Sequence, residues 1–191
     1  MKPNRNCIWI LSFILISLST CSKATVMDTG SFSIYILKSY WQDLKLGYDL
    51  EQSWSILQEA DLTKNIKVIT AGDIQTYNWS SQTITLTQEA SAYFNELPNE
   101  VKLEIENFKP AFVVVLNDHR LYGGLIIEGG TAMGTHYPVI YTNMRSNPVV
   151  FTIRPYLAPG LEYEQFDLSS KQIIENHEVY DLFDRLGKIT R

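Results

Sequence analysis

Hydrophobic and polar positions along this chain follow patterns that separate short strands from amphipathic helices. Residues 83–86 (TITL) alternate as a half-buried strand does, whereas residues 111–116 (AFVVVL) form the continuous apolar run of a strand buried on both faces. Between them, residues 88–97 carry apolar side chains at helical spacing, and Thr87 is placed to cap that helix. The same reasoning predicts further strands at residues 32–37, 66–69, 120–127 and 149–153, and further helices at 49–60, 99–108 and 177–186, the last capped by Asn176.

Turn-forming residues divide these elements from one another. Residues 77–81 (YNWSS) and 117–119 (NDH) are predicted turns. Gly123-Gly124 predicts a bulge or a close backbone approach within its strand. Proline, glycine and acidic residues dominate 154–170 and predict an irregular surface segment. Together the elements predict an α+β fold, with a mostly antiparallel sheet and helices packed on one face.

The start of the chain has a different pattern. Lys2 and Arg5 precede an apolar run of 11 residues, 8–18. This run is shorter than the ~20 residues that a membrane-spanning helix needs, and it is typical of a signal-peptide core. We therefore predict a cleaved lipoprotein-type signal peptide, a tether and a single α+β domain, at residues 1–20, 21–31 and 32–191.

Two cleavage sites are compatible with this signal. Residues 18–21 (LSTC) resemble the bacterial lipobox, in which the cysteine is lipidated and becomes the new N-terminus, although Thr20 stands where Gly, Ala or Ser is usual. No cysteine follows Cys21, which favours lipid attachment there. A lipid would anchor the protein without spanning the membrane, and we expect the periplasmic face of the outer membrane. Cleavage after Ala24 is the alternative, and it would give a soluble periplasmic or secreted protein.

Composition and charge narrow the class of partner. The chain is 45% hydrophobic and 19% charged, which is ordinary for a globular protein. Its net charge is −5, so a nucleic-acid partner is not expected. A protein or a cell-wall component is the expected partner.

The candidate chemistry of the sequence is sparse. Three histidines, His119, His136 and His177, lack the short spacing of metal ligands, and we predict neither a metal nor a cofactor. Asp118 and His119, with Glu128 across the hairpin, form a candidate acid–base set. Polar residues also gather in turns for backbone reasons alone, and the chain has no GxSxG elbow. We therefore predict no catalytic residue.

Aromatic residues are abundant, with 11 Tyr, 4 Trp and 8 Phe. Tyr and Trp are frequent in binding hot spots, so Tyr77 and Trp79, together with Asp118 and His119, are the candidate recognition surface. The alternative is that the aromatic rings fill the core of a small domain.

A run of strand, helix, strand, turn and strand covers residues 82–141. Its pieces are residues 83–90 (TITLTQEA) with Phe94, the strand 112–116, the turn at Asn117-Asp118 and the return that ends at 128–132 (EGGTA). This run resembles the periplasmic head subdomain of the protein-translocase subunit SecD. The resemblance implies a fold and a compartment, and it supplies no catalytic residue. The longer pattern also resembles small exported bacterial proteins without assigned function, through Asp73, Ile74, Tyr77 and Trp79 (DIxxYxW) and Leu186-Gly187-Lys188.

The expected function is an exported, membrane-anchored, non-enzymatic binding or assembly module of the bacterial cell envelope. One alternative is a cell-envelope hydrolase that uses His119 with Asp118 or Glu128. The other is an inhibitor or immunity protein against a basic secreted partner, because complementary charge speeds association.

Overall fold

The computed structural model describes residues 30–46, 50–128, 135–155 and 172–191. The predicted signal peptide (1–20), Cys21 and most of the predicted tether lie outside these ranges, as do residues 156–170 of the predicted irregular segment. No helix within the described ranges is long and apolar enough to span a membrane.

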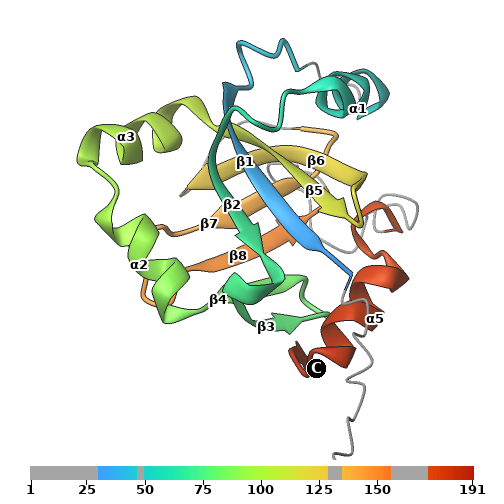
Figure 1. Ribbon diagram of the computed structural model, residues 1–191. Coiled ribbons are helices and arrows are strands. Elements are labelled where there is room, and N and C mark those ends of the chain that lie inside the picture. The colour runs from blue at the N-terminus through green and yellow to red at the C-terminus, as the bar shows by residue number, and fades with distance from the viewer. Residues whose placement is uncertain (1–29, 47–49, 129–134, 156–171) are drawn as a thin grey trace, which may run out of the picture.

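Nine strands in the described ranges form one sheet, which curls into a half-barrel (Figure 1). The strands are β1 (Phe32–Tyr40), β2 (Asn65–Thr70), β3 (Ile74–Asn78), β4 (Thr83–Leu86), β5 (Pro110–Leu116), β6 (His119–Glu128), β7 (Val139–Thr142), β8 (Val150–Arg154) and β9 (Ile189–Thr190). Their order is β2-β1-β5-β6-β7-β8-β4-β3-β9. The β6–β7 and β3–β9 pairs are parallel, and the other neighbours are antiparallel. The predicted α+β class and mostly antiparallel sheet are therefore confirmed.

Two of the helices begin at a residue whose side chain caps them, as the sequence predicts. Thr87 accepts a hydrogen bond from the backbone N–H of Ala90 at the start of one helix, and Asn176 accepts from Glu178 and Val179 at the start of another. Both caps satisfy amides that the first helical turn leaves without a partner. The helices are α1 (Leu50–Glu59), the short 3₁₀ turn η1 (Ala71–Asp73), α2 (Gln88–Glu96), α3 (Asn99–Phe108) and α5 (His177–Arg185).

The two faces of the sheet are covered by different helices. Successive side chains of a strand point to opposite faces. In β5, Phe112 and Val114 join a large cluster with α2, α3 and α5, which we call the inner cluster. Val113 and Val115 join a smaller cluster with Leu57 of α1, which we call the α1-side cluster. The prediction that helices pack on one face is therefore wrong for α1, because β5 is apolar on both faces and each face needs a cover.

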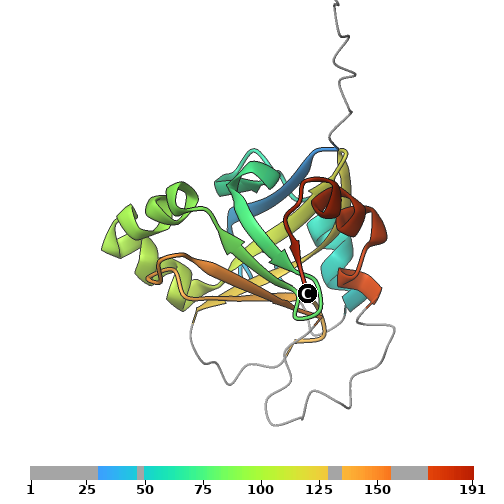
Figure 2. The same cartoon turned by 90° about the horizontal axis from the view of Figure 1, so that it is seen from below.

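The helices of the inner cluster lie at two separate places along the curl. In both views α2 and α3 lie at one end of the sheet and α5 at the other (Figures 1 and 2). At the α5 end, aromatic rings meet edge to face in a continuous chain. Ring centroids are 5.0 Å apart for Phe32 and Phe183, 5.3 Å for Phe183 and Tyr77, and 5.4 Å for Tyr77 and Trp79. Such contacts add to the stabilisation that burial of the rings provides.

Two strands at the α5 end differ from the sequence prediction. Residues 77 and 78 belong to β3 rather than to a turn, and the turn lies after them, where the Gln82 N–H donates to the carbonyl of Trp79. The Tyr77 N–H donates to the carbonyl of Lys188, next to β9. Asn78 pairs with Thr83 of β4 on one side and with Thr190 of β9 on the other, so strand pairing extends further towards the turn than the local signal of Asn78 and the serines predicts.

Gly124 confirms the predicted close approach within β6. A Cβ at this position would lie 1.6 Å from the backbone oxygen of Pro138. One residue later the parallel pairing with β7 begins, at Leu125 and Val139. Glycine at 124 therefore lets β7 enter the sheet beside β6.

Candidate functional site

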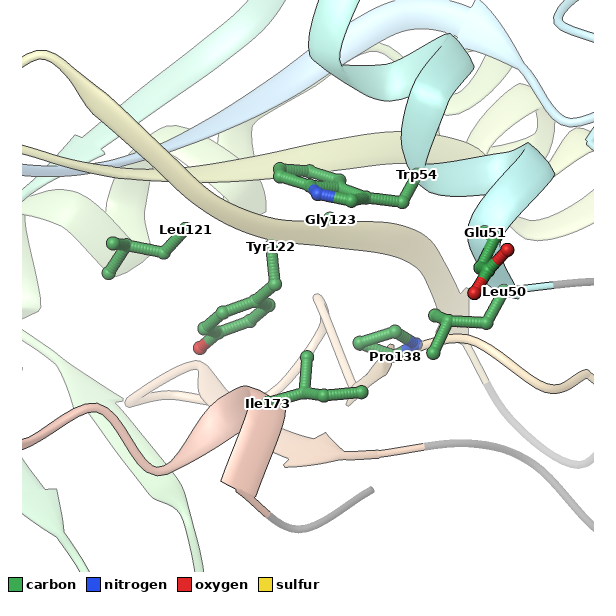
Figure 3. Close-up of a pocket in the computed structure, with 8 residues that line it drawn as sticks. All are labelled: Leu50, Glu51, Trp54, Leu121, Tyr122, Gly123, Pro138 and Ile173. Atoms are coloured by element: carbon green, nitrogen blue, oxygen red, sulfur yellow. The ribbon is translucent and has the colours of Figure 1, made fainter. Parts of the chain in front are cut away.

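A pocket of about 290 Å³ lies between α1, β6 and the residues that precede β7 (Figure 3). Its lining consists of Leu50, Glu51, Trp54, Leu121, Tyr122, Gly123, Pro138 and Ile173. All of these are apolar except Glu51 and Tyr122. Figure 3 shows Glu51 and Tyr122 on opposite sides of the pocket. Concave sites with an apolar wall and a few polar groups are the usual form of small-ligand sites.

The pocket lies where β6 loses its neighbour. The β6–β7 register runs from Leu125 to Glu128, so in the described structure the earlier half of β6 pairs with β5 alone. The Leu125 N–H faces β7, since it donates to the carbonyl of Pro138 at 3.2 Å. Because backbone groups alternate along a strand, the N–H and C=O of Gly123 face the same side, towards the pocket. The pocket is thus a gap in the sheet with an apolar lining.

Helix α1 forms the opposite wall because two kinds of contact hold it over β6. Leu57 is fully buried in the α1-side cluster. The guanidinium of Arg120 donates to the carbonyl of Leu57 at 2.7 Å and to that of Ala60 at 2.8 Å, at the end of the helix. A cation at a helix C-terminus is favourable for the helix dipole as well. The side chains of Leu50, Glu51 and Trp54, in the first turns of this helix, line the pocket.

Tyr122 is the buried polar residue of the pocket. Its side chain is 4% exposed and its ring lies 6.3 Å from that of Phe112. The ring belongs to the inner cluster. Burial raises the pKa of Tyr122 well above the ordinary value of 10, because the charged phenolate would lose its water. The hydroxyl therefore stays protonated over the physiological range.

The predicted recognition surface is not a single surface. Tyr77 is 1% exposed, and its hydroxyl donates to the side-chain oxygen of Gln82, so placing Tyr77 on a surface was wrong. The cause is β3, which turns the Tyr77 ring into the inner cluster. Trp79 is half-buried, and its ring centroid lies 5.2 Å from that of Tyr180. Core packing therefore explains Tyr77, and Trp79 retains only part of its surface.

Asp118 and His119 are exposed at the β5–β6 connection, with Asp118 in the left-handed region at φ 65°. His119 is the first residue of β6 rather than part of the turn. Glu128 is the last residue of the same strand, which places it about 30 Å from His119. Its carboxylate accepts from the N–H of Met144. The expectation that Glu128 lies across the hairpin from His119 is therefore wrong, since β6 carries the two residues to opposite ends.

Within the part of the chain that the structure describes, the histidines, the remaining candidates for catalysis or metal binding, do not lie together with other such residues. His119, His136 and His177 are all exposed, and no group of three metal-ligating side chains occurs among the residues the structure describes. The Tyr40 hydroxyl donates to Glu104 at 3.1 Å, which places this aromatic residue on α3. Of the described regions, the pocket is where an apolar cavity and a buried polar group meet.

Sequence reasoning missed this site. Trp54 falls in the predicted helix 49–60 and Gly123 in the predicted close approach of the glycine pair, but neither pattern indicates a cavity. The other walls, Pro138 and Ile173, come from segments far along the chain and meet β6 through tertiary packing. The glycine pair was the available signal, because it marks where β6 and β7 approach one another.

No family model, curated protein or solved structure matches this chain. The resemblance of residues 82–141 to the SecD head subdomain stays a prediction.

Proposed function

We propose that this protein is an exported, membrane-anchored binding module of the bacterial cell envelope, which holds an apolar ligand in the α1–β6 pocket and catalyses no reaction. The observation that carries the proposal is the pocket, with Trp54 on one wall and β6 on the other. Burial of apolar surface is the dominant favourable term in association, and a preformed concave wall reduces the ordering cost of binding.

The chemistry of the lining supports binding rather than catalysis. Its ionisable groups among the described residues are the carboxylate of Glu51 and the phenol of Tyr122, on opposite sides of the pocket. Acid–base catalysis needs groups within hydrogen-bond reach of one reacting atom, and nucleophilic catalysis needs a nucleophile beside a base. The lining offers neither arrangement.

The hydrolase alternative gains no support from the geometry of its residues. His119 and Asp118 are exposed, and Glu128 lies at the far end of β6. The inhibitor alternative rests on the net charge of −5. It predicts binding to a basic protein that weakens strongly in high salt, whereas occupation of an apolar pocket is insensitive to salt.

Export and anchoring rest on the basic and apolar pattern before Cys21. Cells that express the full chain are labelled with palmitate. We expect label on the wild type and none on Cys21→Ala. An unlabelled wild type, or label that survives the substitution, overturns the anchor.

Binding is tested with ethylbenzene, a small neutral hydrocarbon, on protein purified from cells that express the full chain. A ligand that binds the folded state raises the unfolding temperature. We expect a rise for the wild type and for the matched control Trp41→Ala, whose tryptophan lies outside the lining, and no rise for Trp54→Ala. An unchanged wild type, or equal rises in the two variants, contradicts binding in this pocket.

A further inference from the structure

We propose that the pocket binds an extended peptide segment of a partner protein, which pairs with the pocket-facing side of Gly123 in β6 and places one apolar side chain beside Trp54. This inference rests on the proposed binding function and names the class of its ligand. A peptide carries the backbone donor and acceptor that pair with the edge of a strand, whereas a plain hydrocarbon carries neither.

The first step is the point at which the pairing of β6 with β7 ends. The parallel register pairs Leu125 with Val139, and the Leu125 N–H donates to the carbonyl of Pro138. Two residues earlier, the same register would require the N–H of residue 138 to donate to the Gly123 carbonyl. Proline has no N–H, so Pro138 cannot form this bond and the ladder stops at Leu125.

The second step is the backbone of Gly123. Its N–H and C=O face the same side as those of Leu125, because backbone groups alternate along a strand. Among the described residues, neither group forms a backbone hydrogen bond on that side. Gly123 is nevertheless buried, and it lines the pocket. Buried backbone groups are nearly always paired, so a ligand that brings one acceptor and one donor fits this position.

An extended peptide residue brings both groups together. Two opposed residues of antiparallel strands exchange both N–H···O bonds, so one ligand residue pairs with the N–H and the C=O of Gly123. Side chains of opposed residues lie on the same face of a sheet. A Cβ on Gly123 would lie 3.1 Å from Cδ1 of Leu57, so that face is the one covered by α1. The ligand's side chain therefore lies beside Trp54 (Figure 3), and glycine leaves room for it.

The lining determines which side chain and which flanking charges fit. About 290 Å³ lies at the small end of ligand pockets, which suits one large apolar side chain with its peptide unit. The lining's charged side chain is that of Glu51, and the described lining holds no lysine, arginine or histidine. The whole chain is acidic as well, with a net charge of −5. Charge complementarity therefore favours a segment with neutral or basic flanks over an acidic one.

The test uses N-acetyl-L-leucine N′-methylamide, which carries one complete peptide residue, and two forms of it with an added N-methyl group. Methylation of the leucine nitrogen removes the N–H that donates to the Gly123 carbonyl. Methylation of the C-terminal amide removes an N–H that points away from Gly123, and this form is the matched control. Affinities are measured by NMR titration of protein from cells that express the full chain. We expect the first methylation to weaken binding about three- to tenfold, the effect of one neutral hydrogen bond, and the second to change it less than about twofold.

Two further comparisons locate the compound and its side chain. Trp54→Ala should abolish binding, and the matched control Trp41→Ala, whose tryptophan lies outside the lining, should leave it unchanged. If Trp54→Ala does not fold, the Gly123 amide signal of the wild type must shift on addition of the compound. The D-leucine compound directs its side chain to the other face of the sheet, so we expect it to bind more weakly than the L-leucine compound.

Ethylbenzene, titrated in parallel, separates this inference from the proposed function. If ethylbenzene binds and the leucine amide does not, the peptide ligand is overturned while the apolar site stands. Equal affinities of the two methylated forms, or of the L and D compounds, also overturn the inference, because the ligand then forms no strand-like pair with Gly123. If the wild type binds neither ethylbenzene nor the leucine amide, the proposed function itself fails.

Discussion

The two faces of the curled sheet are buried by clusters of different size and make-up. On the inner side, three helices and a chain of aromatic rings cover β5 with large, fully buried side chains such as Phe94, Phe151 and Phe183. On the other side, a smaller cluster covers β5 and β6. It is formed by α1, the segment after β1 with Leu46, and Tyr137, and Arg120 donates hydrogen bonds to carbonyls at the end of α1. The pocket opens where this thinner cover meets the unpaired half of β6. The comparison indicates that the inner side supplies stability and that the pocket forms where the two sides meet, with Trp54 from the α1 side and Tyr122 from the inner cluster.

The sharpest way to break this comparison is to remove an inner ring. Phe183→Ala takes away a fully buried side chain that contacts both Phe32 and Tyr77. We expect it to lower the free energy of unfolding by about 3–5 kcal/mol, through lost burial and a residual cavity. Denaturant unfolding measures the loss, and Trp54→Ala on the half-buried pocket wall should cost clearly less. Equal losses would contradict the assignment of stability to the inner side.

Gly124→Ala probes the junction between the two sides. The new methyl group would overlap the Pro138 backbone oxygen, so β6 and β7 must separate. We expect a loss of about 3 kcal/mol in unfolding free energy, at the upper end of typical overpacking costs. Gly72→Ala is the control, because its nearest neighbour is the Thr70 hydroxyl at 3.4 Å. Similar thermal unfolding of the two variants would show that the close approach is not required.

Arg120→Met tests the hydrogen bonds that hold the end of α1 over β6. The substitution removes two hydrogen bonds to the carbonyls of Leu57 and Ala60 while it keeps an apolar stem. Hydrogen bonds to a charged group contribute about 1.5–3 kcal/mol, and we expect a loss in that range. Hydrogen exchange should speed up in α1 and stay unchanged in α5. Faster exchange in both helices would contradict an independent α1 side.

Alkaline pH separates the buried tyrosines from the exposed ones. Burial raises the pKa of Tyr122 and Tyr77 in the folded protein above the ordinary value of 10. Their contribution to stability is complete below pH 10 and is lost as pH rises above it, because only the unfolded state releases these protons readily. Each such tyrosine adds a slope of about 1.4 kcal/mol per pH unit. Unfolding between pH 9 and 11 should be less steeply pH-dependent in Tyr122→Phe, and an unchanged slope would mean that Tyr122 is solvated.

The smallest expected effect concerns the start of α5 on the inner side. Asn176→Ala removes the acceptor for two backbone amides and should cost about 1 kcal/mol, whereas Asn176→Asp keeps a side-chain oxygen there. Thermal unfolding of the pair measures the difference. If the two variants are equally unstable, the cap does not hold the helix.

Much of the fold could be predicted because its signals are local. The apolar run of β5, the alternation of β4 and the caps Thr87 and Asn176 each depend on a few neighbouring residues. β3 and β9 were missed because they are short, and because β9 joins the sheet by pairing with β3, which is far away in the sequence. The placement of α1 on the second face was missed because a helical apolar stripe does not say which face it covers.

The candidate site was far less predictable. It needs residues from α1, β6, the segment before β7 and the segment before α5 to converge. That convergence depends on the register at which β7 joins β6, which Gly124 permits but does not specify. Conversely, Tyr77 looked like a recognition residue because tyrosine suits both surfaces and cores, and only the pairing of β3 decides between them.

The most direct test of the account is an NMR titration that locates a bound hydrocarbon. Ethylbenzene is added to ¹⁵N-labelled protein from cells that express the full chain, and the amide and indole signals are followed. We expect shifts at the Gly123 amide and the Trp54 indole, which line the pocket, and none at the Trp79 indole, which lies in the aromatic chain of the inner side. Shifts at Trp79 without shifts at Trp54 and Gly123, or no shifts at all, would contradict the central claim.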